Sequence, residues 1–222
     1  MNPDFLAPLA AATVGLLQLM MACAAWLMLR GPRHARTVQL WAAGTLALGV
    51  SLALGGLAHP LPPHLPVAVQ QGWLPALVLA ALLLRVLALR RHMGRPLHLG
   101  AGVTLAAGVA LGWLACLQSD DPRVPASYAN AVLILGTAII GQHAWEDSRS
   151  SGAATARWVA WAEWLLTAAL ALRAIAIAAA APVAGRWDWW LVLGAAGVAA
   201  LFGNLGYLGM VLDDLHRTAL QA

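Results

Sequence analysis

The sequence predicts an all-α, polytopic membrane protein: a bundle of seven transmembrane helices with its N-terminus outside and its C-terminus in the cytoplasm. Its 222 residues are 61% hydrophobic and only 10% charged, with a mean hydropathy of +0.75, a composition unlike that of soluble domains. Seven apolar stretches are long enough to cross a hydrocarbon core about 30 Å thick. Arginines gather in the connections on one side of these stretches, which is typical of cytoplasmic loops.

The seven stretches follow one another through short connections. About 20 apolar residues in a helix suffice to span the hydrocarbon core. Proline or glycine marks the connections, which read RGPRHAR, AHPLPPHLP, RRHMGRP, SDDPRVP, DSRSSGAATAR and PVAGRW. Residues 1–212 then form one transmembrane domain, and residues 213–222 begin a cytoplasmic signalling helix. We expect the spans at residues 6–29, 38–57, 66–89, 97–117, 126–146, 158–181 and 188–212.

Individual spans carry further signals. The first is too long for a removable signal peptide, and no basic residue precedes it. The fourth has glycines at 108 and 112, and the last has them at 203, 206 and 209; such spacing lets helices approach closely. The sixth is rich in alanine, in TAALALRAIAIAAAA. We expect the sixth and last spans to lie centrally in the bundle.

The arginines set the orientation, because cytoplasmic loops retain basic residues. They also explain the net charge of +4 better than a nucleic-acid surface does, since they do not form one basic face. We expect a multi-pass membrane protein with no nucleic-acid partner. One side holds Arg30, Arg33, Arg36, Arg90, Arg91, Arg95, Arg149, Arg157 and Arg217, and the other holds Arg123 and Arg186.

Ionisable residues inside a span are costly and are expected to face a partner. Arg85 in the third span and Glu163 in the sixth lie at one depth, about four and five residues from the cytoplasmic end. We predict an ion pair between them in the inner leaflet. The alternative is that Arg85 extends to the cytoplasmic headgroups.

Arg173 lies deeper in the sixth span, among alanine and isoleucine. Gln70 and Gln71 of the third span and Tyr128 and Asn130 of the fifth lie near the same outer depth. These residues predict an outward-facing pocket that binds a small anionic, carbonyl-bearing or hydrophobic ligand through Arg173. The alternative is that Arg173 satisfies helix-end carbonyls or reaches the outer interface.

A second polar set lies toward the cytoplasmic side. Asn204 and Tyr207 of the last span are expected to hydrogen-bond across helices with Gln142 and His143 of the fifth. Together with Arg85 and Glu163, Asn204 and Tyr207 are predicted to couple a stimulus to the last helix. The alternative is static contact between helices.

Signals for chemistry are weak. The sequence contains no phosphate-binding loop, no HExxH and no GxSxG, and without lysine it cannot form a retinal Schiff base. Its histidines are not stacked at two depths, as haem ligation across a membrane requires. We expect no catalytic residues, no metal and no cofactor within these residues.

The last span continues into charged sequence. Leu208, Leu212, Leu215 and Ala219 follow the four-three-four spacing of a coiled-coil seam. This seam runs past Asp213 and Asp214 toward the cytoplasm. It predicts a parallel homodimer through the last helix. A helix that continues out of the bundle can transmit a rotation or a small displacement from the membrane to the cytoplasm.

Four stretches resemble the seven-helix membrane input domain of bacterial GGDEF-type diguanylate cyclases and of some sensor histidine kinases. They are RVLALRRHMGRP, GQHAWEDSR, WAEWLLTAALALRAIAI and GYLGMVLDDLHR. The resemblance implies a module that senses a signal in or near the bilayer and passes it to a cytoplasmic output domain, most often one that makes cyclic di-GMP. No GGDEF motif occurs within these residues.

The residues and this resemblance therefore favour a sensory module of the bacterial inner membrane, whose partners are the bilayer, a second copy and an output domain. Three other classes remain open. They are a small membrane transporter or channel, a membrane-embedded enzyme or electron carrier, and a structural membrane anchor that only dimerises its partner. A coloured preparation with haem or flavin absorbance would support the second of these.

Overall fold

The computed structural model describes residues 3–28, 35–56, 67–96, 99–121, 123–179 and 187–220, and within them the regular structure is helical throughout. The prediction of an all-α fold is confirmed for this part of the chain. The elements are α1 (Pro3–Met28), α2 (Ala35–Gly56), α3 (Val67–His92), α4 (Leu99–Cys116), α5 (Arg123–Ser151), α6 (Ala154–Ala178), α7 (Trp187–Val198), the π-helical turn η1 (Ala199–Gly203) and α8 (Asn204–Leu220).

By length and composition, six helices of the described chain are able to cross a membrane. The apolar part of α4, Gly100–Cys116, is shorter than these six. The protein is thus a multi-pass membrane protein with six candidate spans, where the sequence predicts seven. The six are Pro8–Leu27, Arg36–Gly55, Trp73–His92, Arg123–Ser151, Ala154–Ala178 and Trp190–Leu220.

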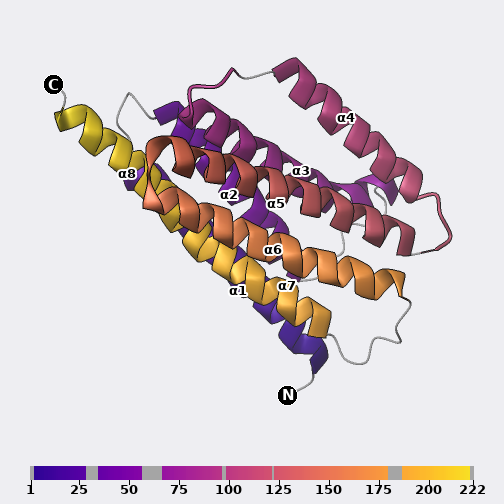
Figure 1. The fold of residues 1–222 in the computed structure, drawn as a ribbon. Helices are drawn as coiled ribbons and strands as arrows, with labels where there is room; N and C mark the ends of the chain where they lie inside the picture. Colours follow the sequence, from indigo (N-terminus) through magenta and orange to yellow (C-terminus); the bar gives the residue numbers. More distant parts are fainter. Residues whose placement is uncertain are drawn as a thin grey trace.

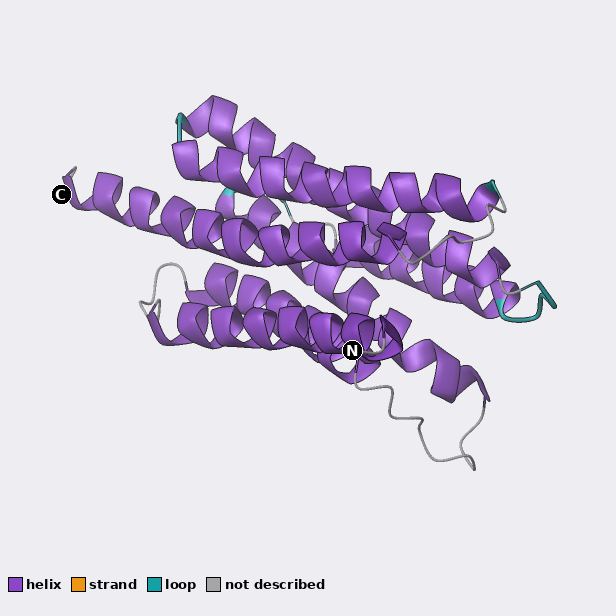
Figure 2. Ribbon diagram, turned by 90° about the horizontal axis from the view of Figure 1, so that it is seen from below, coloured by secondary structure: helices purple, strands orange, loops and turns teal. Residues whose placement is uncertain are grey.

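The bundle is built from helical hairpins and one long final helix. α1 packs along α2, α2 along α3, and α5 along α6, while α7 and α8 lie against α6 (Figure 1). α4 stands apart at one edge, where it packs against α3 and α5 (Figure 1). At the opposite side α8 extends beyond its neighbours to the C-terminus (Figures 1 and 2).

The final helix follows one helical path from Trp187 to Leu220. The residues that flank its π-helical turn keep right-handed helical dihedrals, with φ −61° and ψ −45° at Val198 and φ −76° and ψ −44° at Asn204. The turn is therefore a local widening and not a break. The sequence predicts an unbroken last helix, and the described residues confirm it, although the wide turn itself was not predicted.

The connection between the fifth and sixth spans is shorter than expected. DSRSSGAATAR was predicted as a loop, but α5 continues to Ser151 and α6 begins at Ala154. Gly152 adopts φ +72°, a conformation that glycine allows without steric cost, and the Ser151 hydroxyl accepts a bond from the Ala153 N–H at 3.1 Å. Gly152 and the extended Ala153 therefore make the whole turn.

Glycines bring the last helix close to α6. A Cβ at Gly206 would lie 2.8 Å from the Thr155 carbonyl oxygen, and one at Gly209 would lie 2.5 Å from the Thr155 side chain. The close packing predicted for this helix is confirmed. The same prediction for Gly108 in α4 is wrong, because nothing lies within 4 Å of its Cβ position.

Candidate functional site

A buried ion pair joins α3 to α6 beside the π-helical turn. Arg85 Nη2 lies 2.6 Å from Glu163 Oε1, and the side chains are 2% and 0% exposed. The predicted pair is confirmed, and Arg85 does not extend to the headgroups. A Cβ at Gly203 would lie 3.3 Å from Arg85 Nη2 and 3.5 Å from Glu163 Oε1. The absence of a side chain at the end of η1 thus leaves room for the pair.

The second helix, α2, also contacts Arg85. A Cβ at Gly44 would lie 2.9 Å from Arg85 Cγ, so the arginine stem crosses α2 where α2 has no side chain. The Arg85 guanidinium carbon lies 4.3 Å from the centroid of a Trp41 ring, an attractive arrangement for a cation and an aromatic face. Among the described residues, Arg85 Nε and Glu163 Oε2 have no hydrogen-bond partner. The pair is therefore held through one short contact and not through two parallel bonds.

Asn204, the first residue of α8, is the hub of the hydrogen bonds. Its Oδ1 accepts from Trp41 Nε1 at 2.8 Å and from Thr45 Oγ1 at 3.0 Å. Its Nδ2 donates to Gln18 Oε1 at 2.9 Å and to the Ala200 carbonyl at 2.6 Å. Both amide donors and both acceptor positions are used. One side chain thus links the last helix to α1 and α2 and to a carbonyl of its own π-helical turn.

Tyr207 lies one turn further along α8. Its ring stacks on Trp41 with centroids 4.1 Å apart and planes at 4°, and its hydroxyl donates to the Thr37 carbonyl at 3.2 Å. Trp41 therefore contacts Asn204, Tyr207 and Arg85. We call the set Gln18, Thr37, Trp41, Thr45, Arg85, Glu163, Asn204 and Tyr207 the polar core.

The polar core differs from the prediction in its partners. Gln142 and His143 do not reach Asn204 or Tyr207; Gln142 donates to Glu146 at 3.1 Å, and His143 lies 3.7 Å from the same carboxylate. These residues are three and four positions apart on α5, so they meet on one helix face. Arg95 completes this outer group, 2.6 Å from Glu146. The predicted fifth-span partners are therefore wrong.

Sequence reasoning missed Gln18, Trp41 and Thr45. Gln18 carried a usable signal, because it is a polar residue in the middle of an apolar span and polar side chains there face a partner. Trp41 carried none, since tryptophan near a span end is typical of the membrane interface.

Beyond the polar core, α8 remains attached to α6 and then becomes exposed. Thr155 Oγ1 donates to Asp213 Oδ2 at 3.0 Å. Of the four seam residues, Leu208 packs in the hydrophobic core of the chain, whereas Leu212 and Leu215 are 55% and 37% exposed. The predicted seam is therefore available from Leu212 onward and not from Leu208.

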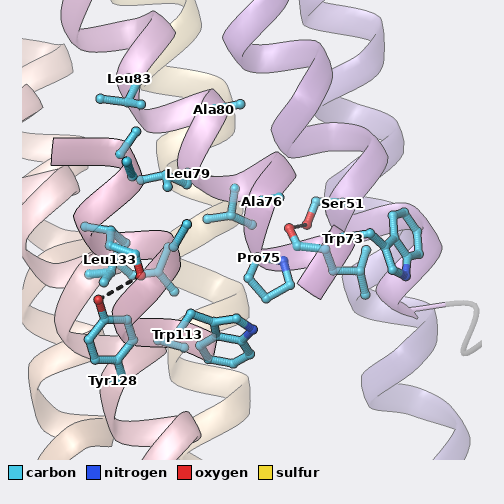
Figure 3. Close-up of a pocket in the computed structure, with 18 of the residues that line it drawn as sticks. Ser51, Trp73, Pro75, Ala76, Leu79, Ala80, Leu83, Trp113, Tyr128 and Leu133 are labelled. Atoms are coloured by element: carbon cyan, nitrogen blue, oxygen red, sulfur yellow. Dashed lines mark hydrogen bonds between the residues drawn. The ribbon is translucent and has the colours of Figure 1, made fainter. Parts of the chain in front are cut away.

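Of the predicted ligand-binding residues whose side chains the structure describes, one lines a cavity. Tyr128 lines a cavity of about 890 Å³ between α3, α4 and α5 (Figure 3), and Arg173 and Asn130 do not line it. Asn130 is buried on α5. Gln70 and Gln71 fall in α3, and their side chains lie outside the described residues. In the described part of the chain, no three His, Cys, Asp or Glu side chains are grouped to hold a metal.

The fold and the polar core define a class: a polytopic helical membrane protein whose last helix leads from a buried polar centre to beyond the bundle. The chain belongs to a family of unknown function, DUF6962, which matches residues 9–184. The match includes both members of the Arg85–Glu163 pair and ends before α7. No curated protein and no solved structure matches the sequence.

Proposed function

We propose that the protein is a sensory module of the bacterial inner membrane. It passes a stimulus through its last helix to a cytoplasmic output domain of the diguanylate cyclase type. One observation supports this proposal above the others: a single helical path, Trp187–Leu220, contains both the buried hub Asn204 and the exposed end of α8. A change at the hub therefore has a direct mechanical route out of the bundle.

In the proposed arrangement the chain crosses the membrane seven times, with α4 as the fourth crossing. The arginine distribution supports an N-terminus outside and a C-terminus in the cytoplasm. Under this topology the Arg85–Glu163 pair lies toward the cytoplasmic side. The end of α8 then reaches the aqueous phase in which an output domain would lie.

The polar core is the proposed coupling element. Hydrogen bonds between membrane helices contribute about 0.6 kcal/mol on average and up to about 1.7 kcal/mol. Breaking the bonds of Asn204 to α1 and α2 would thus change the relative stability of two helix arrangements by a few kcal/mol. A difference of this size is sufficient to shift their populations. Among the described residues, Arg85 Nε and Glu163 Oε2 have no hydrogen-bond partner, which supports a second arrangement in which they find partners.

Dimerisation would join two stalks, a name we use for the exposed end of α8 at residues 212–220. Leu212 and Leu215 are exposed on α8, and apolar residues spaced three apart on an exposed helix are typical of a two-stranded contact. We propose a parallel homodimer through this part of α8, in which rotation of one helix changes the spacing of the output domains.

The experiment fuses a diguanylate cyclase domain after Ala222 and measures cyclic di-GMP in bacterial cells. One variant carries a heptad inserted after Arg217, and another carries two inserted residues. At about 100° per residue the heptad returns the stalk close to its original face, whereas two residues turn it by about 200°. We expect the heptad variant to keep the output of the parent fusion and the two-residue variant to change it severalfold.

A point variant tests the polar core independently of the insertions at the end of α8. Asn204→Leu is expected to shift cyclic di-GMP in the same assay, because it removes the bonds to Gln18, Trp41 and Thr45. The matched control is Thr104→Ala, which removes only a local bond within α4. Equal cyclic di-GMP levels in both insertion variants and both point variants would contradict the proposed relay. They would support a structural membrane anchor instead.

A further inference from the structure

The cavity at the edge of the bundle is nearly free of polar groups. Its walls come from α3, α4 and α5, with Ser51 contributed by α2 (Figure 3). Among the described residues that line it, none is Asp, Glu, Lys, Arg or His. A charged ligand group inside would therefore lack a partner, which is costly in an apolar environment.

The few polar atoms in the walls are mostly occupied. The Ser51 hydroxyl donates to the Leu74 carbonyl at 3.4 Å, and the Tyr128 hydroxyl donates to the Val109 carbonyl at 2.9 Å. Trp113 Nε1 has no hydrogen-bond partner among the described residues. The walls thus offer an occupant apolar contact and at most one weak polar anchor.

The size of the cavity suits a ligand and not a packing defect. Its volume of about 890 Å³ falls in the range of about 300–1,000 Å³ that is usual for ligand pockets. An empty space of this size would deprive its lining side chains of dispersion contacts. In a membrane, the most abundant group that can make apolar contacts with these walls is the hydrocarbon chain of a lipid.

Helix α4 forms the outer wall. The residues Val103, Ala106, Ala110 and Trp113 line the cavity at spacings of three and four, which is one face of a helix. The opposite face carries Leu105 and Leu111, which are 59% and 66% exposed, and Val103 on the cavity face is 69% exposed. α4 therefore forms one wall of a cavity that is also open to the surroundings of the bundle.

Tyr128 holds this wall at a fixed place. Its hydroxyl reaches the backbone of α4 at Val109, and a Cβ at Gly112 would collide with the same hydroxyl. The glycine thus admits the tyrosine, and the tyrosine keeps α4 against α5. The cavity is consequently bounded by a defined contact and not by loose packing alone.

We propose that this cavity is a binding site for one unbranched alkyl chain, either of a free fatty acid or of a phospholipid, whose headgroup stays outside the apolar walls. The site does not depend on the relay proposed above, because no polar-core residue lines it. The proposed signalling function can therefore be wrong while the alkyl-chain site is right, and the two tests distinguish these outcomes.

The test is photolabelling of the full chain in lipid nanodiscs, with labelled residues located by mass spectrometry. Two probes carry the same mid-chain diazirine: a palmitic acid analogue and a phosphatidylethanolamine acylated with it. We expect labels on the cavity side of α3, α4 and α5. Labelling by the acid alone identifies a fatty-acid site, labelling by the phospholipid alone identifies a lipid-chain site, and labelling by both identifies a site open to either; each outcome supports the proposal.

Matched variants decide whether the label reports the cavity. Ala106→Phe and Ala110→Phe place a ring where the chain would lie, and either is expected to reduce labelling of α3 and α5 about tenfold. Ala101→Phe is the control, because Ala101 lies exposed on α4 and does not line the cavity. Even labelling of all outward helix faces, including Leu105 and Leu111, with equal yields in the three variants would overturn the proposal. Two filling variants are used so that failure of one to fold does not remove the test.

Discussion

The polar core and the region around α4 hold helices together in opposite ways. Around Asn204, side chains from five helices meet through hydrogen bonds of 2.8–3.2 Å and one ion pair of 2.6 Å. α4 meets its neighbours across an apolar cavity, with one tyrosine bond to its backbone. Polar contacts fix the rotation of a helix because each donor requires one acceptor, whereas apolar contacts in a bilayer compete with equally apolar lipid. The comparison teaches that individual polar residues determine how the helices pack in the polar core. Around α4, contacts between helices can instead be replaced by contacts with a ligand.

The ion pair provides the largest expected difference between the two regions. Arg85→Met or Glu163→Leu alone leaves a buried charge without its partner and should lower the free energy of unfolding by about 3–5 kcal/mol. The double variant should lose clearly less than the sum, because no buried charge remains. Unfolding in mixed detergent micelles, followed by circular dichroism, measures all three. The exposed Arg95–Glu146 pair is the control, and Arg95→Met should cost about 0–1 kcal/mol.

Loss of the Asn204 hub is next in size. Asn204→Leu leaves Trp41 Nε1 and Gln18 Oε1 without their partners, and each unsatisfied buried group costs about 1–3 kcal/mol. The same unfolding measurement applies. Thr104→Ala in α4 should lie within about 0.5 kcal/mol of the parent. Similar losses for both variants would contradict the contrast between the regions.

Glycine substitutions test packing without changing polarity. Gly206→Ala puts a methyl group 2.8 Å from the Thr155 carbonyl, and overpacking of this kind costs about 1–3 kcal/mol. Gly108→Ala meets open space, and alanine in a helix interior should stabilise the chain by about 0.5–1 kcal/mol. Opposite signs in the two melting shifts are expected. Equal signs would mean that α4 is packed as tightly as α8.

The smallest effect is expected at the tyrosine contact. Tyr128→Phe removes one bond to the Val109 carbonyl, which contributes about 0.5–1.5 kcal/mol. Hydrogen exchange read by mass spectrometry should accelerate in α4 while α8 stays unchanged. Acceleration spread over the whole bundle would show that α4 is not separable from the polar core.

Much of the fold follows from the sequence, because length and hydropathy determine where helices lie. The Arg85–Glu163 pair also followed, since an ionisable group in a span requires a partner at its own depth. The partners of Asn204 did not follow. Gln18 lies 186 residues away and Thr45 lies 159 away, and apolar spans surrounded by lipid have no hydrophobic stripe to reveal which face turns inward.

The position of the cavity did not follow from the sequence. The sequence favoured Arg173 as an anchor because it is an isolated charge, but the cavity lies where α4 stands away from α3 and α5. Its position depends on how helices tilt, which packing decides and composition does not. The turn after α5 was missed for a different reason: Gly152, with a positive φ, and the extended Ala153 suffice to reverse the chain, so the polar residues around them are helical.

The widened turn Ala199–Gly203 contains one residue more in each hydrogen-bonded ring than an α-helical turn does. Removing a single residue from it would restore ordinary α-helical spacing there while the segments before and after kept the faces they present. Anywhere else in this helix, the same deletion would rotate every later side chain by about 100°. A one-residue change in length therefore preserves the faces of this helix only within the turn Ala199–Gly203. Asn204, whose amide donates to the Ala200 carbonyl, directly follows this turn in the sequence.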